Sequence, residues 1–300
     1  MGVRGLRLSL PATSANLGPG FDAAGLALSM RLTVEAQVAT EFEIHATGRD
    51  AEMCGGLENH LILETYRDVL GRAGGAVLPL RIRLHNEIPL GMGCGSSAAA
   101  ILAGVALADH FGSLGMRDEG IVAEASRIEG HPDNVAACWY GGLTVSAQDG
   151  DAVRVATFGG NPEWAMLLAL PSTSLATKQA RALLPESYSK VDAIFNVQRA
   201  MLLVAAFAQG RLDLLQTAMQ DRMHQPFRME ACPLLKTLLP LAAEPKIAGA
   251  ALSGAGPSVL VFLAADTTVL EAETIVLGLA SPGVEVVPLR IGRGVEKTVL

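Results

Sequence analysis

The sequence is most constrained by a glycine-rich segment at residues 89–99, which leads directly into an apolar run at 96–111. Glycines occupy alternate positions in this segment, at Gly91, Gly93 and Gly95. Glycine lets the backbone approach a ligand closely, and the free amides at the start of a helix favour an anion. Ser96 and Ser97 add hydroxyls that could cap the helix or reach phosphate or magnesium. The segment predicts a phosphate-binding loop or, alternatively, only a tight strand-to-helix turn.

Two common nucleotide loops are excluded by the residues around these glycines. The Walker loop requires Gly-Lys followed by Ser or Thr, and no Gly-Lys pair occurs in the chain. The dinucleotide fingerprint requires a third glycine where Ser96 stands, inside a β-α-β unit that the pattern does not show. A phosphate-binding loop here must therefore be of another kind.

The remaining pattern mixes strands and helices without strict alternation, which favours an α+β fold over a doubly wound parallel sheet. Strands are expected at 3–10, 26–38, 78–84, 142–146, 152–157, 164–170, 248–253, 258–263 and 284–288. Helices are expected at 58–70, 96–111, 119–129, 190–209, 212–219, 233–239 and 269–279. Gly159, Gly160 and Pro162 cluster near the middle, so we expect two domains, 1–158 and 159–300.

Charge and apolar content narrow the class of protein. The 300 residues are half apolar and carry a net charge of -7, with no block of Lys and Arg, which argues against a nucleic-acid partner. The most apolar stretch, 247–265, is interrupted by Ser and Pro, and no signal peptide opens the chain, so we expect a cytoplasmic protein with no membrane partner. The four cysteines lack C-x-x-C spacing, which favours reduced thiols.

The segment 11–22 places Asn16 and Asp22 around two glycines. Such a polar loop could hold an amino group and a hydroxyl, although the same residues are ordinary turn chemistry. The segment 129–134 concentrates Glu129, His131, Asp133 and Asn134, and Glu129 with Ser97 would suit a magnesium ion. A solvated loop is the alternative for this second segment.

Two arginines are candidates for binding a carboxylate. Arg181 follows Thr177 by one helical turn, if 177–181 is helical, and Arg228 closes the segment 223–228. A guanidinium can bind a carboxylate through two parallel hydrogen bonds, although either arginine could equally be a surface side chain. The small residues of 252–258 predict a turn that packs closely against another loop.

Together these segments resemble the three motifs of the GHMP small-molecule kinases, in the same order along the chain. The opening block PATSANLGPGFDAAGLAL is similar to the version found in the homoserine kinases of that family. The resemblance implies a two-domain α+β fold, with an N-terminal domain like ribosomal protein S5 domain 2, a ferredoxin-like C-terminal domain and an active site between them. It also implies ATP and Mg²⁺, L-homoserine as the acceptor in threonine biosynthesis, and a homodimer.

The resemblance carries roles onto particular residues. ATP binding falls on Pro89, Leu90, Gly91, Met92, Gly93, Cys94, Gly95, Ser96, Ser97, Ala98 and Ala99, where Cys94 takes the place of a usual Leu. Metal binding falls on Ser97 and Glu129, with Glu124 as a rival. Substrate binding falls on Asn16, Asp22, His131, Thr177, Arg181 and Arg228, with Asp22 at the ammonium and the arginines at the carboxylate. The catalytic set is Asn16, Glu129, Asp133, Asn134 and Thr177, and alignment of the hydroxyl is expected to replace a strong base.

Two other readings stay open from the residues. A GHMP kinase for another alcohol, such as an isoprenoid intermediate, shikimate or a sugar, would have no use for Asp22 opposite two arginines. A non-catalytic relative that only binds ligand would have little reason to keep Ser97, Glu129 and Thr177 together.

Overall fold

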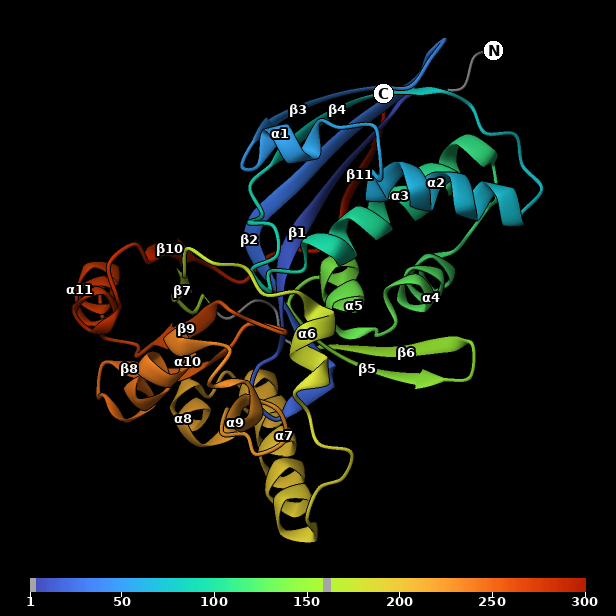
Figure 1. Cartoon of the computed structure of the whole chain (residues 1–300). Helices are drawn as coiled ribbons and strands as arrows, with labels where there is room; N and C mark the ends of the chain where they lie inside the picture. Colours follow the sequence, from blue (N-terminus) through green and yellow to red (C-terminus); the bar gives the residue numbers. More distant parts are fainter. Residues whose placement is uncertain (1–3, 159–162) are drawn as a thin grey trace.

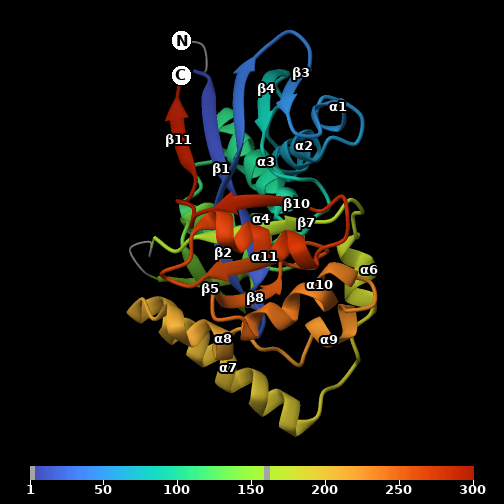
Figure 2. The ribbon, with the colours of Figure 1, turned by 90° about the vertical axis from the view of Figure 1, so that its left-hand side faces the viewer.

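A computed structural model describes residues 4–158 and 163–300. The chain forms two sheets with helices packed on both, so the expected α+β class is confirmed (Figures 1 and 2). The glycine-rich boundary expected at 159–162 lies outside the described residues, as does Val3 at the start of the first expected strand. The division at 158/159 therefore stays a prediction.

The larger sheet is built around two long antiparallel strands. Its strands are β1 (Leu6–Asn16), β2 (Gly20–Val38), β3 (Glu43–Gly48), β4 (Leu80–Asn86), β5 (Leu143–Asp149), β6 (Ala152–Phe158) and β11 (Glu296–Val299). Burial alternates at the start of β1 and in the second half of β2, as expected for a sheet with one face on a core, whereas residues 10–16 of β1 are all buried. The pairing of β1 with β2 shifts register between Ala15 and Asn16, where the chain turns through 17–19 into the segment that carries Asp22.

Helices cover one face of this sheet (Figure 1). They are α1 (Ala51–Cys54), α2 (Leu61–Arg72), α3 (Ser96–Gly112), α4 (Asp118–Glu129) and α5 (Asp133–Tyr140). The Ala-rich α3 is buried almost all round, because it packs against β1, α2, α4 and α5 at once. This packing holds the first turn of α3 in place at the end of the sheet.

The smaller sheet is antiparallel, in the order β10-β7-β9-β8. Its strands are β7 (Met166–Leu170), β8 (Ile247–Leu252), β9 (Val259–Leu263) and β10 (Glu285–Leu289). Around it lie α6 (Thr177–Ala182), α7 (Lys190–Gln209), α8 (Leu215–Ala218), α9 (Gln225–Arg228), α10 (Pro233–Leu238), α11 (Val269–Leu279) and the 3-10 turns η1 (Leu212–Leu214) and η2 (Leu239–Ala243). The short α6 lies between the two halves in Figure 1, beside α5.

Several elements were not expected from the sequence, among them α1 and α9. The parallel strand β3 and the helix α5 are new, and the C-terminal strand β11 pairs with β1. The side chain of Arg31 donates to Ser9 and to the carbonyl of Gly294, which ties the last segment to the first sheet. The end of the chain therefore packs with the first half, although the predicted division assigns it to the second.

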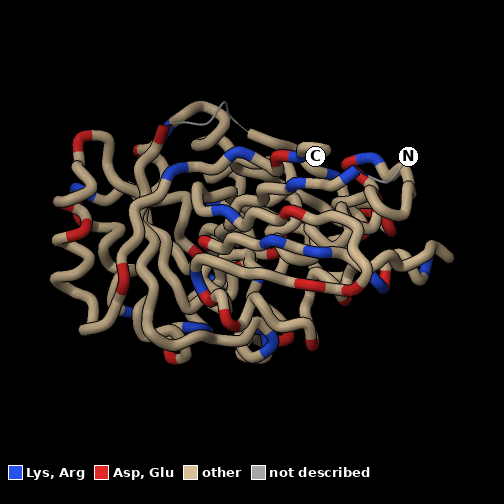
Figure 3. The backbone as a smooth tube through the Cα atoms, turned by 90° about the horizontal axis from the view of Figure 1, so that it is seen from above, with Lys and Arg blue, Asp and Glu red and all other residues tan. Residues whose placement is uncertain are grey.

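The distribution of charged residues and the length of the apolar helices relate to the expectation that neither nucleic acid nor a membrane is a partner. Lys and Arg are interspersed with Asp and Glu along the described chain (Figure 3). Within the described residues, α7 is the one helix long and apolar enough to cross a membrane by length and composition, and 22% of its most apolar window is buried.

Candidate active site

The glycine-rich segment forms the loop between β4 and α3. Gly91, Gly93 and Gly95 have φ values of 68°, 74° and 68°. Residues with a Cβ rarely adopt this conformation, so the glycines are required by the backbone itself. The loop ends with Gly95 as the N-cap of α3, and the first two residues of that helix, Ser96 and Ser97, line the cavity beside it.

A cavity of about 220 Å³ lies where the loop meets the second half of the chain. Most of the predicted site residues line it: Asn16, Asp22, Gly91, Gly93, Cys94, Gly95, Ser96, Ser97, Glu129, His131, Asp133, Asn134, Thr177, Arg181 and Arg228. The other predicted loop residues lie elsewhere. Pro89, Ala98 and Ala99 are buried, Met92 packs on the core and Leu90 lines a neighbouring cavity. Cys94 is also buried in the core, as a small apolar residue would be.

Thr13 holds the loop in place from the first strand. Its amide donates to the carbonyl of Cys94 at 3.0 Å, and its hydroxyl donates to Oδ1 of Asn134 at 2.6 Å. A Cβ added to Gly95 would collide with the Thr13 hydroxyl. Thr13 therefore joins the glycine-rich loop to the start of α5, a role that the sequence did not indicate.

Gly95→Ala is expected to raise the ATP KM by about tenfold or more, since the added methyl strains a positive φ and displaces Thr13. Gly74→Ala is the matched control, because Gly74 also has positive φ but no atom lies within 4 Å of the position its Cβ would take. The ATP KM of both variants would be measured by steady-state kinetics, and only the Gly95 variant should show the increase. An equal effect of both on the ATP KM would contradict the role of Gly95.

Ser97 and Glu129 meet at the rim of the cavity. The Ser97 hydroxyl, in the first turn of α3, donates to Oε2 of Glu129, the last residue of α4, at 2.7 Å. Burial raises the pKa of Glu129, against the opposing effect of this hydrogen bond. A hydroxyl and a carboxylate are hard oxygen donors, so the pair fits a magnesium ion.

The rival Glu124 lies away from this pair. It accepts from Arg127 at 3.0 Å and also pairs with Arg72. Although burial opposes the change, these two guanidinium groups lower the pKa of Glu124. Glu124 is therefore engaged in holding α2 against α4.

His131, Asp133 and Asn134 form a linked cluster at the start of α5. Oδ1 of Asp133 lies 2.6 Å from Nδ1 of His131 and accepts from the Asn134 amide at 2.7 Å. Although burial opposes it, the Asp133 carboxylate raises the pKa of His131. Because this oxygen already accepts these bonds, Asp133 is better placed to orient its neighbours than to remove a proton.

Asp22 and Arg181 both line the cavity and form a direct ion pair. The two guanidinium nitrogens donate to the two carboxylate oxygens at 3.0 and 2.6 Å. Thr177 begins the same short helix, α6, one turn before Arg181, so the expected helical spacing is found. Asp22 and Arg181 were expected at opposite ends of a ligand, but the structure brings them into direct contact.

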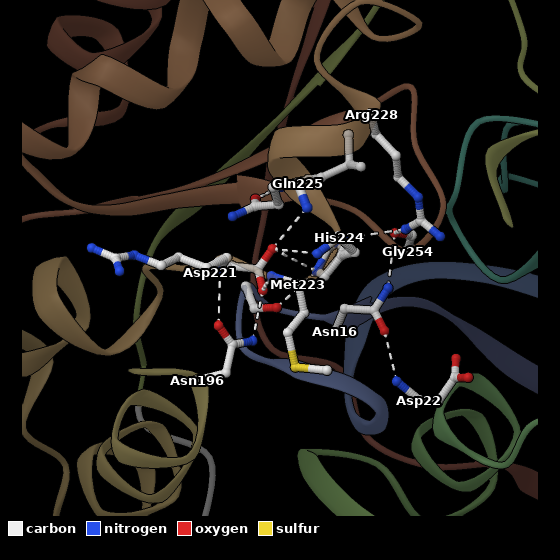
Figure 4. A network of polar contacts seen from close by, with 12 residues as sticks. Asn16, Asp22, Asn196, Asp221, Met223, His224, Gln225, Arg228 and Gly254 are labelled. Atoms are coloured by element: carbon white, nitrogen blue, oxygen red, sulfur yellow. Dashed lines mark hydrogen bonds and ion pairs between the residues drawn. The ribbon is translucent and has the colours of Figure 1, made fainter. Parts of the chain in front are cut away.

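Arg228 lies deeper and is 1% exposed. Within the described chain, Nε of Arg228 donates to the carbonyl of Ala180. Its Nη1 lies within hydrogen-bonding distance of Nδ1 of His224 and donates to the carbonyl of Gly254. The side-chain amide of Asn16 also donates to the carbonyl of Gly254, at 2.9 Å. The side-chain oxygen of Asn16 accepts from the backbone amide of Asp22 (Figure 4). The turn at 253–256 thus packs against both predicted loops, as its small residues indicated; Ser253 also donates to the carbonyl of Gly93 at 2.8 Å.

A second cavity of about 280 Å³ adjoins the first at Ser96 and Ser97. Its walls are mostly apolar and come from α2, α3 and the strands β2 and β4, including Leu32, Ile62, Leu84 and Ala100. No feature of the sequence pattern pointed to this cavity, because its residues come from distant segments. Phe21 and Gly254 were likewise not predicted, although both line the first cavity.

Comparison with known proteins gives consistent matches. Residues 60–142 match the family model of the GHMP kinases N terminal domain, and 203–275 match GHMP kinases C terminal. A homoserine kinase of Solibacter usitatus is 46% identical, covering 85% of this chain and 84% of that one. A homoserine kinase of Deinococcus radiodurans is 38% identical, covering 87% and 85%. The structure of homoserine kinase from Cytophaga hutchinsonii shares the fold, with a TM-score of 0.80 at 23% identity and 98% coverage of both chains.

Proposed function

The chain belongs to the homoserine kinases of the GHMP kinase family, and from this premise we propose that it transfers the γ-phosphate of ATP to the side-chain hydroxyl of L-homoserine. The family and its two-domain α+β fold, both expected from the sequence motifs, are confirmed by these matches. The observation that carries the proposal is one cavity that holds a phosphate loop, a Ser97–Glu129 pair and an Asp22–Arg181 pair.

The two adjoining cavities suit the two parts of ATP. The apolar second cavity fits the flat face of a nucleoside base, and the loop 91–97 lies between it and the first cavity. A triphosphate that runs along this loop would meet the glycine amides and the start of α3. Its terminal phosphate would then lie near Ser97 and Glu129, where a bound Mg²⁺ would neutralise charge on the phosphate oxygens.

The Asp22–Arg181 pair matches the backbone groups of an amino acid. Homoserine carries an ammonium and a carboxylate on one carbon, and a carboxylate and a guanidinium side by side complement both. Arg228 adds a buried positive charge nearby. An acceptor without these two groups would not engage the pair.

Catalysis would depend mainly on alignment of the acceptor hydroxyl. Asn134 and Thr177 line the same cavity as the phosphate loop and Arg181, and we expect them to contact the hydroxyl of a bound homoserine. Asp133 orients His131 and the start of α5. Holding the two reactants in line and neutralising charge can supply most of the acceleration in phosphoryl transfer.

A panel of acceptors tests the substrate. ADP release would be followed with Mg-ATP and L-homoserine, mevalonate, shikimate, galactose or L-serine at equal concentration. Selective turnover of homoserine is expected, because only an amino acid engages Asp22 and Arg181 together, and L-serine is one methylene too short to place its hydroxyl equally. Preference for a sugar or an isoprenoid alcohol would contradict the substrate and leave the kinase class intact.

The setting of the enzyme is also a proposal. We place it in threonine biosynthesis in the cytoplasm, as a homodimer without a nucleic-acid or membrane partner. Sedimentation equilibrium of the purified protein tests the dimer.

A further inference from the structure

His224 lies directly behind the cavity and is fully buried. It precedes α9, and its ring joins two groups that belong to distant parts of the chain (Figure 4). Nδ1 lies 3.2 Å from Nη1 of Arg228, and Nε2 lies 2.7 Å from the carbonyl oxygen of Gly18. One imidazole thus connects the loop after β1 with the buried arginine.

The two partners determine the protonation state of this ring. A carbonyl oxygen can only accept, so Nε2 must carry a proton. A guanidinium can only donate, so Nδ1 must be without one. Burial also lowers the pKa of His224, which disfavours the doubly protonated ring. The contacts therefore select the neutral form with the proton on Nε2.

The turn that carries the His224 ring is held by Asp221. The carboxylate of Asp221 accepts from the backbone amides of Met223, His224 and Gln225, at 2.9, 3.0 and 2.7 Å, and from the side chain of Asn196 at 2.7 Å. These bonds fix the turn from which the imidazole projects (Figure 4). Phe21 stacks on the ring at 5.4 Å between centroids.

The groups that His224 joins also hold the acceptor side of the cavity. Gly18 has a φ of 87°, and a Cβ there would collide with the backbone of Met219, so this loop is seated closely on the second half of the chain. From the loop, Asn16 reaches the same Gly254 carbonyl as Arg228 does, and Asn16 also accepts from the Asp22 amide. A shift of the imidazole would therefore move Arg228 relative to Asp22.

We propose that His224 is a positioning residue for the amino-acid acceptor, which fixes the direction of the Arg228 guanidinium relative to the loop that carries Asp22. The inference rests on the proposed use of Arg228 and Asp22 in binding homoserine. His224 is not among the residues that line the cavity, whereas Arg228 is, so His224 would act on the substrate only through Arg228. Its effect is therefore expected in homoserine affinity and not in ATP affinity.

Two substitutions of His224 test its hydrogen bond to Gly18 and its hydrogen bond to Arg228 separately. In His224→Gln the side-chain amide reaches the place of Nε2 and can donate to Gly18, but no acceptor remains for Arg228. In His224→Asn the amide oxygen lies near the place of Nδ1 and can accept from Arg228. We expect the homoserine KM to rise about tenfold in the Gln variant and about threefold at most in the Asn variant, with the ATP KM within about twofold in both.

A control and a double substitution exclude a general loss of structure. Tyr188→Phe removes a hydrogen bond of 2.8 Å to the carbonyl of Met223 in the same turn without touching Arg228, so it should leave the homoserine KM unchanged. Because His224 acts through Arg228, adding His224→Gln to Arg228→Lys should change the homoserine KM much less than it does alone. Additive effects, or an equal rise of both substrate KM values, would overturn the proposal.

A measurement on the unsubstituted protein keeps the proposal testable if a variant does not fold. Nitrogen NMR of the histidine rings should show His224 with a protonated Nε2 and an unprotonated Nδ1 from about pH 6 to pH 8. A doubly protonated ring, or a proton on Nδ1, would overturn the proposal. This result does not depend on the substrate, whereas failure of the proposed function would appear as absent homoserine turnover in the unsubstituted enzyme.

Discussion

Glu129→Gln is expected to lower kcat by about a hundredfold or more, because it removes the charged oxygen ligand beside Ser97 and keeps the size of the side chain. The same change should raise the Mg²⁺ concentration that gives half-maximal rate. Both quantities come from initial rates measured over a range of Mg²⁺ at saturating ATP and homoserine.

Glu124→Gln is the matched control, since it removes a carboxylate from the same helix. Glu124 pairs with Arg72 and Arg127, so its loss should leave kcat and the Mg²⁺ requirement unchanged. A small decrease in thermal stability is the expected effect. If Glu124→Gln abolished turnover while Glu129→Gln did not, the metal site would have to be moved to Glu124.

Arg181→Ala is expected to lower kcat/KM for homoserine by about a hundredfold, since the guanidinium proposed to bind the substrate carboxylate through charge-assisted hydrogen bonds is removed. The ATP KM should change little. Two acceptors isolate the cause: 3-aminopropan-1-ol lacks the carboxylate, and 4-hydroxybutanoate lacks the ammonium. In the variant, the preference for homoserine over 3-aminopropan-1-ol should collapse, while the preference over 4-hydroxybutanoate should be largely kept.

The control for Arg181 is another arginine with the same bidentate pairing. Arg211 binds Asp213 through two hydrogen bonds at the surface, and Arg211→Ala should leave both KM values unchanged. If Arg181→Ala lowered activity with all three acceptors by the same factor, its role would be to hold Asp22 and not to bind the carboxylate.

The parts of the site that local chemistry dictates could be predicted from the sequence. The alternate glycines before an apolar helix predict a tight loop with positive φ, and Gly91, Gly93 and Gly95 all adopt it. The helix α6 and its spacing of Thr177 and Arg181 also follow a local rule. The helices α7 and α11 have the predicted bounds.

The parts that depend on distant contacts could not be predicted. The exposed, four-residue β11 has little pattern of its own and is a strand because it pairs with β1. The helix α5 begins at residues typical of turns, and the carboxylate of its first residue, Asp133, accepts from the amide of Asn134. Asp22 and Arg181 are 159 positions apart, so their charges indicated two separate ends of a ligand and not one pair.

Phosphorus NMR of a reaction with Mg-ATP and L-homoserine tests the central claim most directly. The account predicts that the γ-phosphate signal of ATP is replaced by one phosphomonoester signal, with a coupling to the side-chain CH₂ of homoserine. Loss of ATP with only inorganic phosphate appearing, or no loss of ATP at all, would contradict transfer to homoserine.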